Sequence, residues 1–254
     1  MSDEVLVEHA HGVTVITLNR PSARNAVNRA VSDRVAAALE DFDSRPDLAV
    51  AIVTGAGGTF CSGMDLKAFV AGEDVSHPER GFAGIAVRPP RKPVIAAVEG
   101  YALAGGCEVA LACDLVVAAD DALFGLPEVK RSLVAGAGGL LRLPRRIPPG
   151  VAMELALTGG FLDAADAHRH GLVNRLTAPG QALAGARALA AEIAANGPLA
   201  VAATKEIIVS SADWSTTDAF ARQQAIMDPV FASADAREGA VAFAEKRPPK
   251  WRGR

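Results

Sequence analysis

The stretch Gly100-Tyr-Ala-Leu-Ala-Gly-Gly-Cys-Glu-Val-Ala-Leu-Ala-Cys-Asp114 places a glycine pair directly before a helix-like apolar run. It predicts a helix that begins at Gly105 and Gly106 and carries Glu108 in its first turn. The N–H groups at a helix start have no partner inside the helix, and the helix dipole is positive there. Such a turn suits a developing oxyanion. For Glu108 alone, ordinary stabilisation of a helix start is the alternative.

Two other segments carry polar groups beside glycine or proline. Residues 60–66, Phe-Cys-Ser-Gly-Met-Asp-Leu, form a small-residue turn that exposes backbone N–H groups. Ser62 is a poor hydrolase nucleophile, because the segment is not G-x-S-x-G and no histidine stands in a recognisable partner segment. Residues 122–130 contain Glu128 directly after a proline. A solvated turn is one interpretation of Glu128, and an acid/base pair with Glu108 is the other.

Strand-like and helix-like segments alternate through the first half of the chain. Apolar residues recur at helical spacing within residues 27–43. The predicted strands are residues 12–18, 49–53, 93–98 and 115–119. This order predicts an α/β fold.

From Gly150 onward alanine dominates and strand signals fade. The predicted helices there are residues 152–157, 182–196, 198–211, 217–227 and 236–245. These helices either meet a partner subunit or cap the sheet. We therefore expect a core with the active site in residues 1–195 and a helical C-terminal region in residues 196–254.

Composition excludes several classes of protein. The 254 residues are half apolar and carry a formal net charge of −3, which argues against disorder and against nucleic-acid binding. The start of the chain has no secretory signal, and no apolar run approaches the length of a membrane span. Three cysteines without a CxxC pair favour a reducing cytoplasm.

Metal and nucleotide motifs are also weak. The His9/His11 and His168/His170 pairs lack a third ligand nearby. The glycine clusters at 55–58 and 136–139 fit neither the dinucleotide fingerprint nor the P-loop. We therefore expect no metal and no nucleotide cofactor.

Taken together and in order, these segments resemble the crotonase superfamily, the enoyl-CoA hydratase/isomerase family. The resemblance covers nearly the whole chain. It is carried by residues 19–26, 60–66, 93–100, 104–108, 113–114, 124–128, 138–139, 171–174 and 238–247.

The resemblance implies a spiral of ββα units with a helical C-terminal trimerisation region, assembled as a homotrimer or dimer of trimers. It implies an acyl-CoA thioester substrate, no further cofactor, and an oxyanion hole made by the N–H groups of Met64 and Gly105. The two glutamates of hydratases match Glu108 and Glu128. Ala104 stands where many members carry a third glycine. The CoA-lining segments match Ser22, Ala23, Arg24, Ser62, Asp65 and Leu66, with Lys67 and Arg24 as charge partners for the phosphates.

Both glutamates are present, which favours hydration of a trans-2-enoyl-CoA to a 3-hydroxyacyl-CoA. A Δ3-Δ2 isomerase, an acyl-CoA hydrolase or a dehydratase of a functionalised acyl-CoA stays open within the family. Residues 128–134 and 140–144 resemble crotonobetainyl-CoA hydratase-like members, so a polar acyl group is one option. A non-catalytic acyl-CoA- or RNA-binding relative is the alternative from another class.

Overall fold

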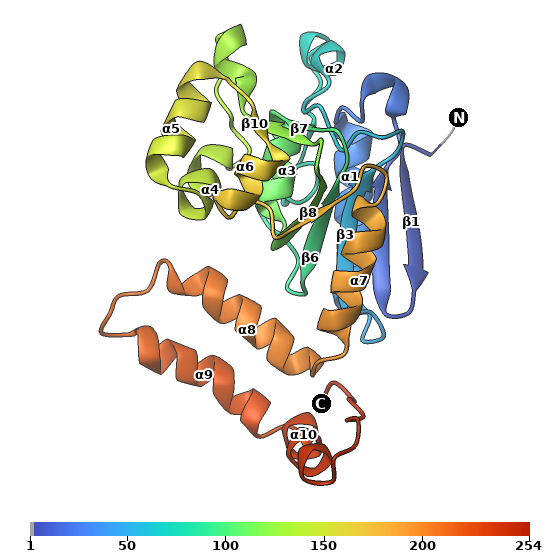
Figure 1. Cartoon of the computed structure of the whole chain (residues 1–254), viewed down its shortest axis with the longest axis vertical. Coiled ribbons are helices and arrows are strands. Elements are labelled where there is room, and N and C mark those ends of the chain that lie inside the picture. Colours follow the sequence, from blue (N-terminus) through green and yellow to red (C-terminus); the bar gives the residue numbers. More distant parts are fainter. Residues whose placement is uncertain (1–2) are drawn as a thin grey trace.

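A computed structural model describes residues 3–254 of the chain. At its centre is a six-stranded sheet with the order β1-β2-β3-β6-β8-β11 (Figure 1). β1 runs antiparallel to β2, and the remaining neighbours pair in parallel. The strands are β1 (Val5–Ala10), β2 (Val13–Leu18), β3 (Val50–Gly55), β6 (Val94–Val98), β8 (Leu115–Ala119) and β11 (Arg175–Thr177).

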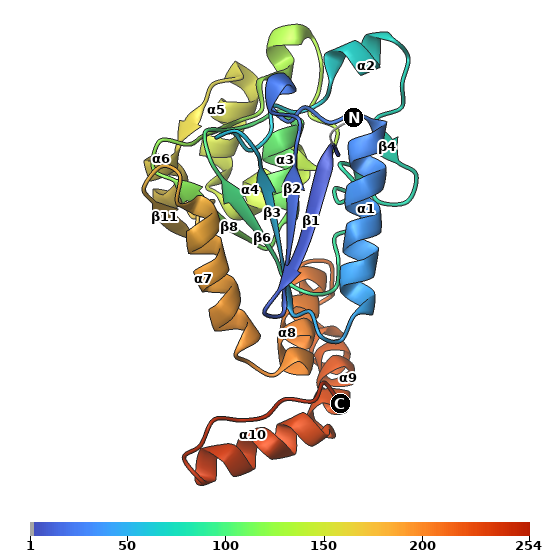
Figure 2. The same ribbon diagram turned by 90° about the vertical axis from the view of Figure 1, so that its right-hand side faces the viewer.

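Helices cover both faces of this sheet, as the alternation of its side chains requires. Val50 and Ile52 of β3 pack in the cluster that contains α7, whereas Ala51 and Val53 pack in the cluster that contains α1 and α3 (Figure 2). Because both faces are buried there, the central strands β6 and β8 are apolar along their whole length. The three helices are α1 (Arg29–Ser44), α3 (Gly105–Ala112) and α7 (Ala182–Ala194).

A second, three-stranded sheet with the order β10-β9-β7 lies beside the first. From β6 in the large sheet, the chain crosses to the small sheet with β7. It then returns through α3 to β8 of the large sheet. It repeats the two-strand step with β8 and β9 before η2 and α4, so ββα units build the region around the site. The additional elements are β7 (Tyr101–Leu103), β9 (Leu123–Gly125), β10 (Leu162–Asp163), η2 (Pro127–Arg131), α4 (Gly139–Arg146), α5 (Pro149–Thr158) and α6 (Ala164–Arg169).

The α/β class and the four predicted strands are confirmed, with ends displaced by at most two residues. Strand signals fade after Gly150, yet two short strands, β10 and β11, follow it and were not predicted. β11 is a short edge strand with exposed residues, so burial gives its sequence no alternation. β1 was also not predicted, and it too is an exposed edge strand.

The C-terminal helices divide into two groups. α7 caps the sheet, whereas α8 (Pro198–Ser211), α9 (Ala219–Phe231) and α10 (Ala234–Ala244) lie beyond one end of it (Figures 1 and 2). The ammonium group of Lys205 ties α8 to the body by donating to the carbonyls of Pro90 and Lys92 and to Asp114 at 2.7–2.9 Å. α8 and α9 contain no fully buried residue. The domain boundary between residues 195 and 196 stays a prediction.

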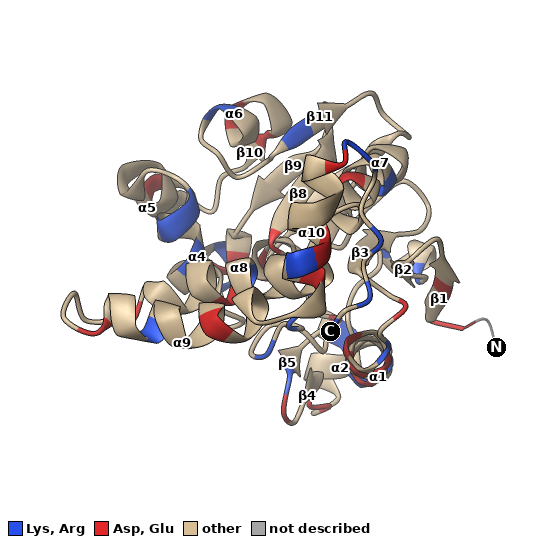
Figure 3. Ribbon diagram, turned by 90° about the horizontal axis from the view of Figure 1, so that it is seen from below, with Lys and Arg blue, Asp and Glu red and all other residues tan. Residues whose placement is uncertain are grey.

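The surface around these helices mixes both signs of charge. α9 carries Arg222 and Asp228, α10 carries Asp235, Arg237 and Glu238, and the view from below shows basic and acidic positions on both helices (Figure 3). Within residues 3–254, no helix combines the length and the apolar character needed to cross a membrane.

Candidate active site

The two segments predicted to bind CoA lie side by side. The carbonyl of Arg24 accepts a hydrogen bond from the Ser62 N–H at 3.0 Å, and the carbonyl of Gly63 accepts one from Val27 at 2.8 Å. Asp65 N–H donates to the Val27 carbonyl at 2.9 Å. The first segment contains η1 (Pro21–Ala23), and the second leads into α2 (Leu66–Val70). Together they carry the seven predicted residues, Ser22, Ala23, Arg24, Ser62, Asp65, Leu66 and Lys67.

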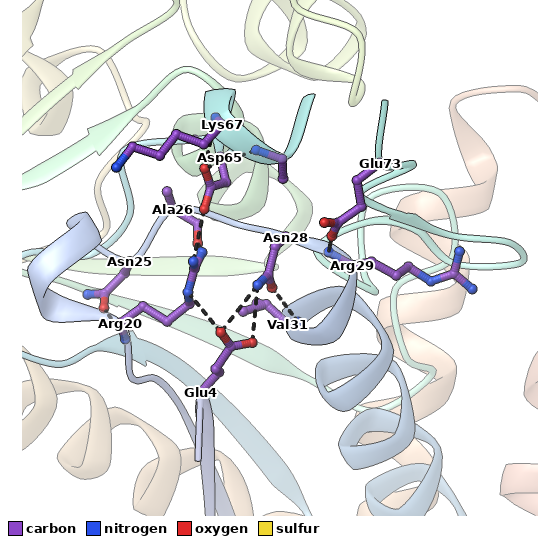
Figure 4. Close-up of polar contacts among 12 residues, drawn as sticks. Glu4, Arg20, Asn25, Ala26, Asn28, Arg29, Val31, Asp65, Lys67 and Glu73 are labelled. Atoms are coloured by element: carbon purple, nitrogen blue, oxygen red, sulfur yellow. Dashed lines mark hydrogen bonds and ion pairs between the residues drawn. The ribbon is translucent and has the colours of Figure 1, made fainter. Parts of the chain in front are cut away.

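A partly buried ion-pair network stabilises this arrangement (Figure 4). Arg20 contacts Glu4 at 3.1 Å and Asp65 at 2.9 Å. Asp65 also caps α2 by accepting from the N–H groups of Lys67 and Ala68. Burial acts to raise the pKa of the Asp65 carboxyl, but the bonds from Arg20 and the two N–H groups outweigh it and hold that pKa below its ordinary value. Asp65 therefore organises the turn as a carboxylate.

The start of α3 packs too closely against its surroundings for any side chain. A Cβ on Gly105 would lie 2.5 Å from the Phe82 ring, and one on Gly106 would lie 2.1 Å from the Cys61 carbonyl oxygen. Gly63 has a φ of +100°, and its Cβ would lie 3.0 Å from the Gly105 nitrogen. The turn at residues 60–66 therefore touches the start of α3, as a shared oxyanion hole requires.

The two predicted oxyanion donors are available for a ligand. Within residues 3–254, no protein acceptor receives the N–H of Met64 or of Gly105. Buried amide groups are almost always paired, so the unpaired N–H of Gly105 marks a place for a ligand oxygen. Ala104 precedes it with a φ of 51° and a ψ of −128°, a strained backbone that costs roughly 1–3 kcal/mol in a residue with a Cβ.

Glu108 points away from the helix start and into the protein. Its side chain is 3% exposed, and Oε1 accepts hydrogen bonds from the N–H groups of Ala137 and Gly139 at 2.7 and 2.8 Å. Burial raises the pKa of this carboxyl above its ordinary value; the two N–H groups and Arg142 act in the opposite direction, and the charge of Glu128 adds to the rise. Glu108 stands in the first turn of α3 as predicted, but its carboxyl group is bound by the loop at residues 137–139.

Glu128 is half-buried on η2 rather than a solvated turn residue. Its Oε2 is buried and has no hydrogen-bond partner within residues 3–254. Burial raises the pKa of this carboxyl as well. Because Glu128 acts electrostatically on Glu108, the fold brings the two acids to one site. Raised pKa values suit groups that exchange protons near neutral pH.

Sequence reasoning missed the residues that position these groups. Arg20 and Phe82 carry no catalytic signal of their own. The glycine cluster at 136–139 fits no nucleotide-binding pattern, yet its loop supplies the N–H groups that hold Glu108. Arg142 lies next to that loop. A repeated glycine cluster without a phosphate fingerprint was the available signal. No group of three or more His, Cys, Asp or Glu side chains in the described chain is placed to hold a metal ion.

This fold, with carboxyl groups buried at its site, is that of a crotonase-superfamily enzyme. The family model described as enoyl-CoA hydratase/isomerase matches residues 8–254. The chain belongs to the enoyl-CoA hydratase/isomerase family.

Individual relatives carry two kinds of name. Carnitinyl-CoA dehydratase of Salmonella arizonae is 43% identical over 261 residues, covering 100% of both chains. The crystal structure of an enoyl-CoA hydratase from Mycobacterium tuberculosis H37Rv has a TM-score of 0.98 at 60% identity, again over 100% of both chains. That of a carnitinyl-CoA hydratase from Mycobacterium avium has a TM-score of 0.81 at 44% identity over 100% of both chains.

Proposed function

We propose that the protein adds water to a trans-2-enoyl-CoA thioester and forms a 3-hydroxyacyl-CoA. One observation carries this proposal: Glu108 is buried on the helix that begins at the unpaired N–H of Gly105, and the half-buried Glu128 lies near enough for its charge to raise the pKa of Glu108. An isomerase needs one proton-transferring group, whereas addition of water needs a proton removed from water and another delivered to carbon. The pair Glu108 and Glu128 supports the second chemistry.

The CoA portion is proposed to lie along the paired segments at residues 22–24 and 62–67. Ser22, Arg24, Leu66 and Lys67 are exposed there, so a long ligand can reach them. Arg24 and Lys67 supply positive charge for the phosphates. Asp65 holds the turn, and the thioester then follows the chain toward Gly105. CoA enters as part of the substrate, and we propose no other cofactor and no metal.

The oxyanion hole is proposed to bind the thioester oxygen. Attack at the β-carbon moves negative charge onto that oxygen, and the N–H groups of Met64 and Gly105 are fixed before the reaction. A preorganised donor of this kind contributes about 3 kcal/mol to the transition state. The Met64 side chain plays no part in this step, since the backbone donates.

The two acids divide the proton transfers. Glu108, oriented by the loop at residues 137–139, accepts a proton from the water that attacks the β-carbon. Glu128 delivers a proton to the α-carbon, and its unpartnered Oε2 is free to face that carbon. Each such transfer contributes about 10²–10⁴-fold to the rate. In the reverse direction Glu128 takes the α-proton, and Glu108 protonates the departing hydroxide.

Dehydration of a functionalised 3-hydroxyacyl-CoA is the second candidate. Relatives named carnitinyl-CoA dehydratase, 41% and 43% identical, favour it. The mycobacterial enoyl-CoA hydratase at 60% identity favours the simple acyl group. Both candidates use the same two acids and differ only in what the acyl pocket accepts.

An absorbance screen tests the proposal. Loss of the conjugated enoyl thioester is followed with crotonyl-CoA, longer 2-enoyl-CoA thioesters and crotonobetainyl-CoA. We expect turnover of an unsubstituted 2-enoyl-CoA with the highest kcat/KM. Turnover of crotonobetainyl-CoA alone would replace the first candidate by the second. No hydration of any thioester, together with salt-dependent RNA retention on a filter, would overturn both.

Assembly as a homotrimer or a dimer of trimers is also proposed, through the C-terminal helices. Large apolar side chains are exposed there, with Phe220 81% and Phe243 87% accessible. An apolar surface of this kind favours contact with another chain. Light scattering after gel filtration should give three or six times the mass of the chain, and a monomer would contradict it. A cytoplasmic location stays a prediction.

A further inference from the structure

Arg142 lies across the loop that holds Glu108. Its Nη1 donates to the Ala137 carbonyl at 3.3 Å, while the N–H of the same residue donates to Glu108. A Cβ on Gly138 would lie 2.3 Å from that Nη1, so the guanidinium packs directly on the backbone of the turn. Displacing Arg142 would therefore move the N–H groups that orient Glu108.

The other end of the guanidinium reaches the opposite side of the site. Nη2 donates to the Ala86 carbonyl at 2.6 Å. Ala86 closes a turn by donating its N–H to the Phe82 carbonyl at 3.1 Å, and the Phe82 ring packs against Gly105. One side chain thus connects the loop behind Glu108 with the wall behind an oxyanion donor.

The charge of Arg142 has no direct partner. Within residues 3–254, its guanidinium donates to two backbone carbonyls and forms no ion pair with a carboxylate, although the side chain is half-buried. A buried cation is normally paired, because leaving water is unfavourable. The carboxyl group on which its charge acts is that of Glu108.

We infer that Arg142 is a positioning residue for the proposed reaction: it holds the loop that orients Glu108 against the turn whose Phe82 ring packs on Gly105. This inference rests on the proposed function. It adds a role for a residue that touches neither substrate nor reacting atoms. A merely structural role would stabilise the fold without setting the ionisation of Glu108.

Other charged and titratable groups act on Glu108 or on Arg142. Glu128 on η2 opposes ionisation of Glu108, and burial raises the pKa of the neighbouring Cys107 thiol to about 12, so that thiol stays neutral. The groups that act on Glu128 or on Arg142 are Arg131, Arg146 and Cys113. Among the residues that the structure describes, only Arg142 both acts on Glu108 and hydrogen-bonds its loop.

Three variants test the inference. Arg142→Gln removes the charge. Arg142→Lys keeps the charge but loses the paired hydrogen bonds to the carbonyls of Ala137 and Ala86. Arg146→Gln is the matched control. Arg146 lies on the same helix and also donates to a carbonyl, that of Cys113, away from the Glu108 loop. The pH dependence of kcat and KM is measured with crotonyl-CoA, together with Tm.

We expect Arg142→Gln to lower kcat about 10- to 100-fold, as a displaced catalytic group does, with a smaller change in KM. The acidic limb of the pH profile of kcat should move to higher pH in this variant, because loss of the positive charge raises the pKa of Glu108. Arg142→Lys should lower kcat while leaving that limb nearly in place. Arg146→Gln should leave the limb unchanged. A limb that does not move in Arg142→Gln, or moves equally in Arg146→Gln, would overturn the inference.

A second readout does not depend on hydration. Infrared titration follows the carboxyl band that disappears in Glu108→Gln. In Arg142→Gln this band should persist to higher pH than in the unmodified protein. If the protein hydrates no thioester but the band shifts, the proposed function fails and the charge effect of Arg142 stands. An unshifted band contradicts the inference whatever the substrate.

Discussion

The two carboxyl groups of the site are held in opposite ways. Glu108 is almost fully buried, and two backbone N–H groups fix one of its oxygens. Glu128 is half-buried, and its Oε2 has no partner in the described chain. Burial raises the pKa of both. In the proposed reaction, the protein orients one acid itself and leaves the other to meet the substrate, a division that suits two different proton transfers.

The largest effect is expected from neutralising the oriented acid. Glu108→Gln keeps an oxygen that can accept from Ala137 and Gly139 but cannot take a proton from water. Hydration of crotonyl-CoA should fall about 10²–10⁴-fold, with little change in Tm. The initial rate of absorbance loss measures it. Turnover near that of the unmodified protein would remove Glu108 from the reaction.

Replacing the unpartnered acid separates the two roles. Butyryl-CoA has no 3-hydroxyl to eliminate, so deuterium uptake at its α-carbon in D₂O reports only proton exchange there. Glu128→Gln should slow this uptake about 100-fold or more, whereas Glu108→Gln should retain most of it. Mass spectrometry gives both rates. Equal losses in the two variants would mean that the acids do not divide the work.

A smaller effect is expected from disturbing the loop without removing an acid. A Cβ on Gly139 would lie 2.8 Å from Cγ and 3.0 Å from Oε1 of Glu108. Gly139→Ala should therefore lower kcat about 10- to 100-fold. Gly136→Ala is the matched control, because the nearest atom to its Cβ, the Val134 oxygen, is 3.8 Å away. The kcat values should differ between these variants, and equal values would contradict the proposed orientation of Glu108 by this loop.

The smallest effect concerns stability. Burial places the folded-state pKa of Glu128 above its unfolded value, so the ionised form destabilises the fold progressively as pH rises from about 4.3, the ordinary value for glutamate, through the raised pKa. Glu128→Gln stays neutral. It should raise Tm by roughly 2–4 °C at pH 8, the change that about 1 kcal/mol produces in a chain of this size.

Calorimetry at pH 8 and pH 4 tests this sign, since the gain in Tm should vanish at the lower pH. Glu154→Gln is the control, because Glu154 is exposed on α5. An equal gain in both variants, or a gain that persists at pH 4, would show that charge burial at Glu128 is not its cause.

Much of the fold was predictable because its signals are local. The buried strand at 94–98 is apolar throughout, the one at 50–55 is so up to Val53, and the glycine pair before Glu108 marks a helix start. The edge strands β1 and β11 were missed, since exposed residues carry no alternation imposed by burial. The order of the motifs predicted the family, which the comparisons confirm.

The candidate catalytic residues of the site were predictable from the sequence, but the residues that hold them in place were not. Glu108 and Glu128 stand in matched motifs, whereas their convergence depends on contacts between segments far apart in the chain. Arg142 reaches Ala86, 56 positions away, and no spacing in the sequence encodes that contact. The strain at Ala104 also appears only in the backbone angles. The CoA-binding and catalytic roles stay proposals.

The most direct measurement is a crystal structure of the Glu108→Gln/Glu128→Gln double variant with crotonyl-CoA, which it should bind without converting. We expect the thioester oxygen about 2.7–3.1 Å from the nitrogens of both Met64 and Gly105. The β-carbon should face residue 108 and the α-carbon residue 128. A thioester oxygen bound elsewhere, or side chains 108 and 128 turned away from these two carbons, would contradict the account.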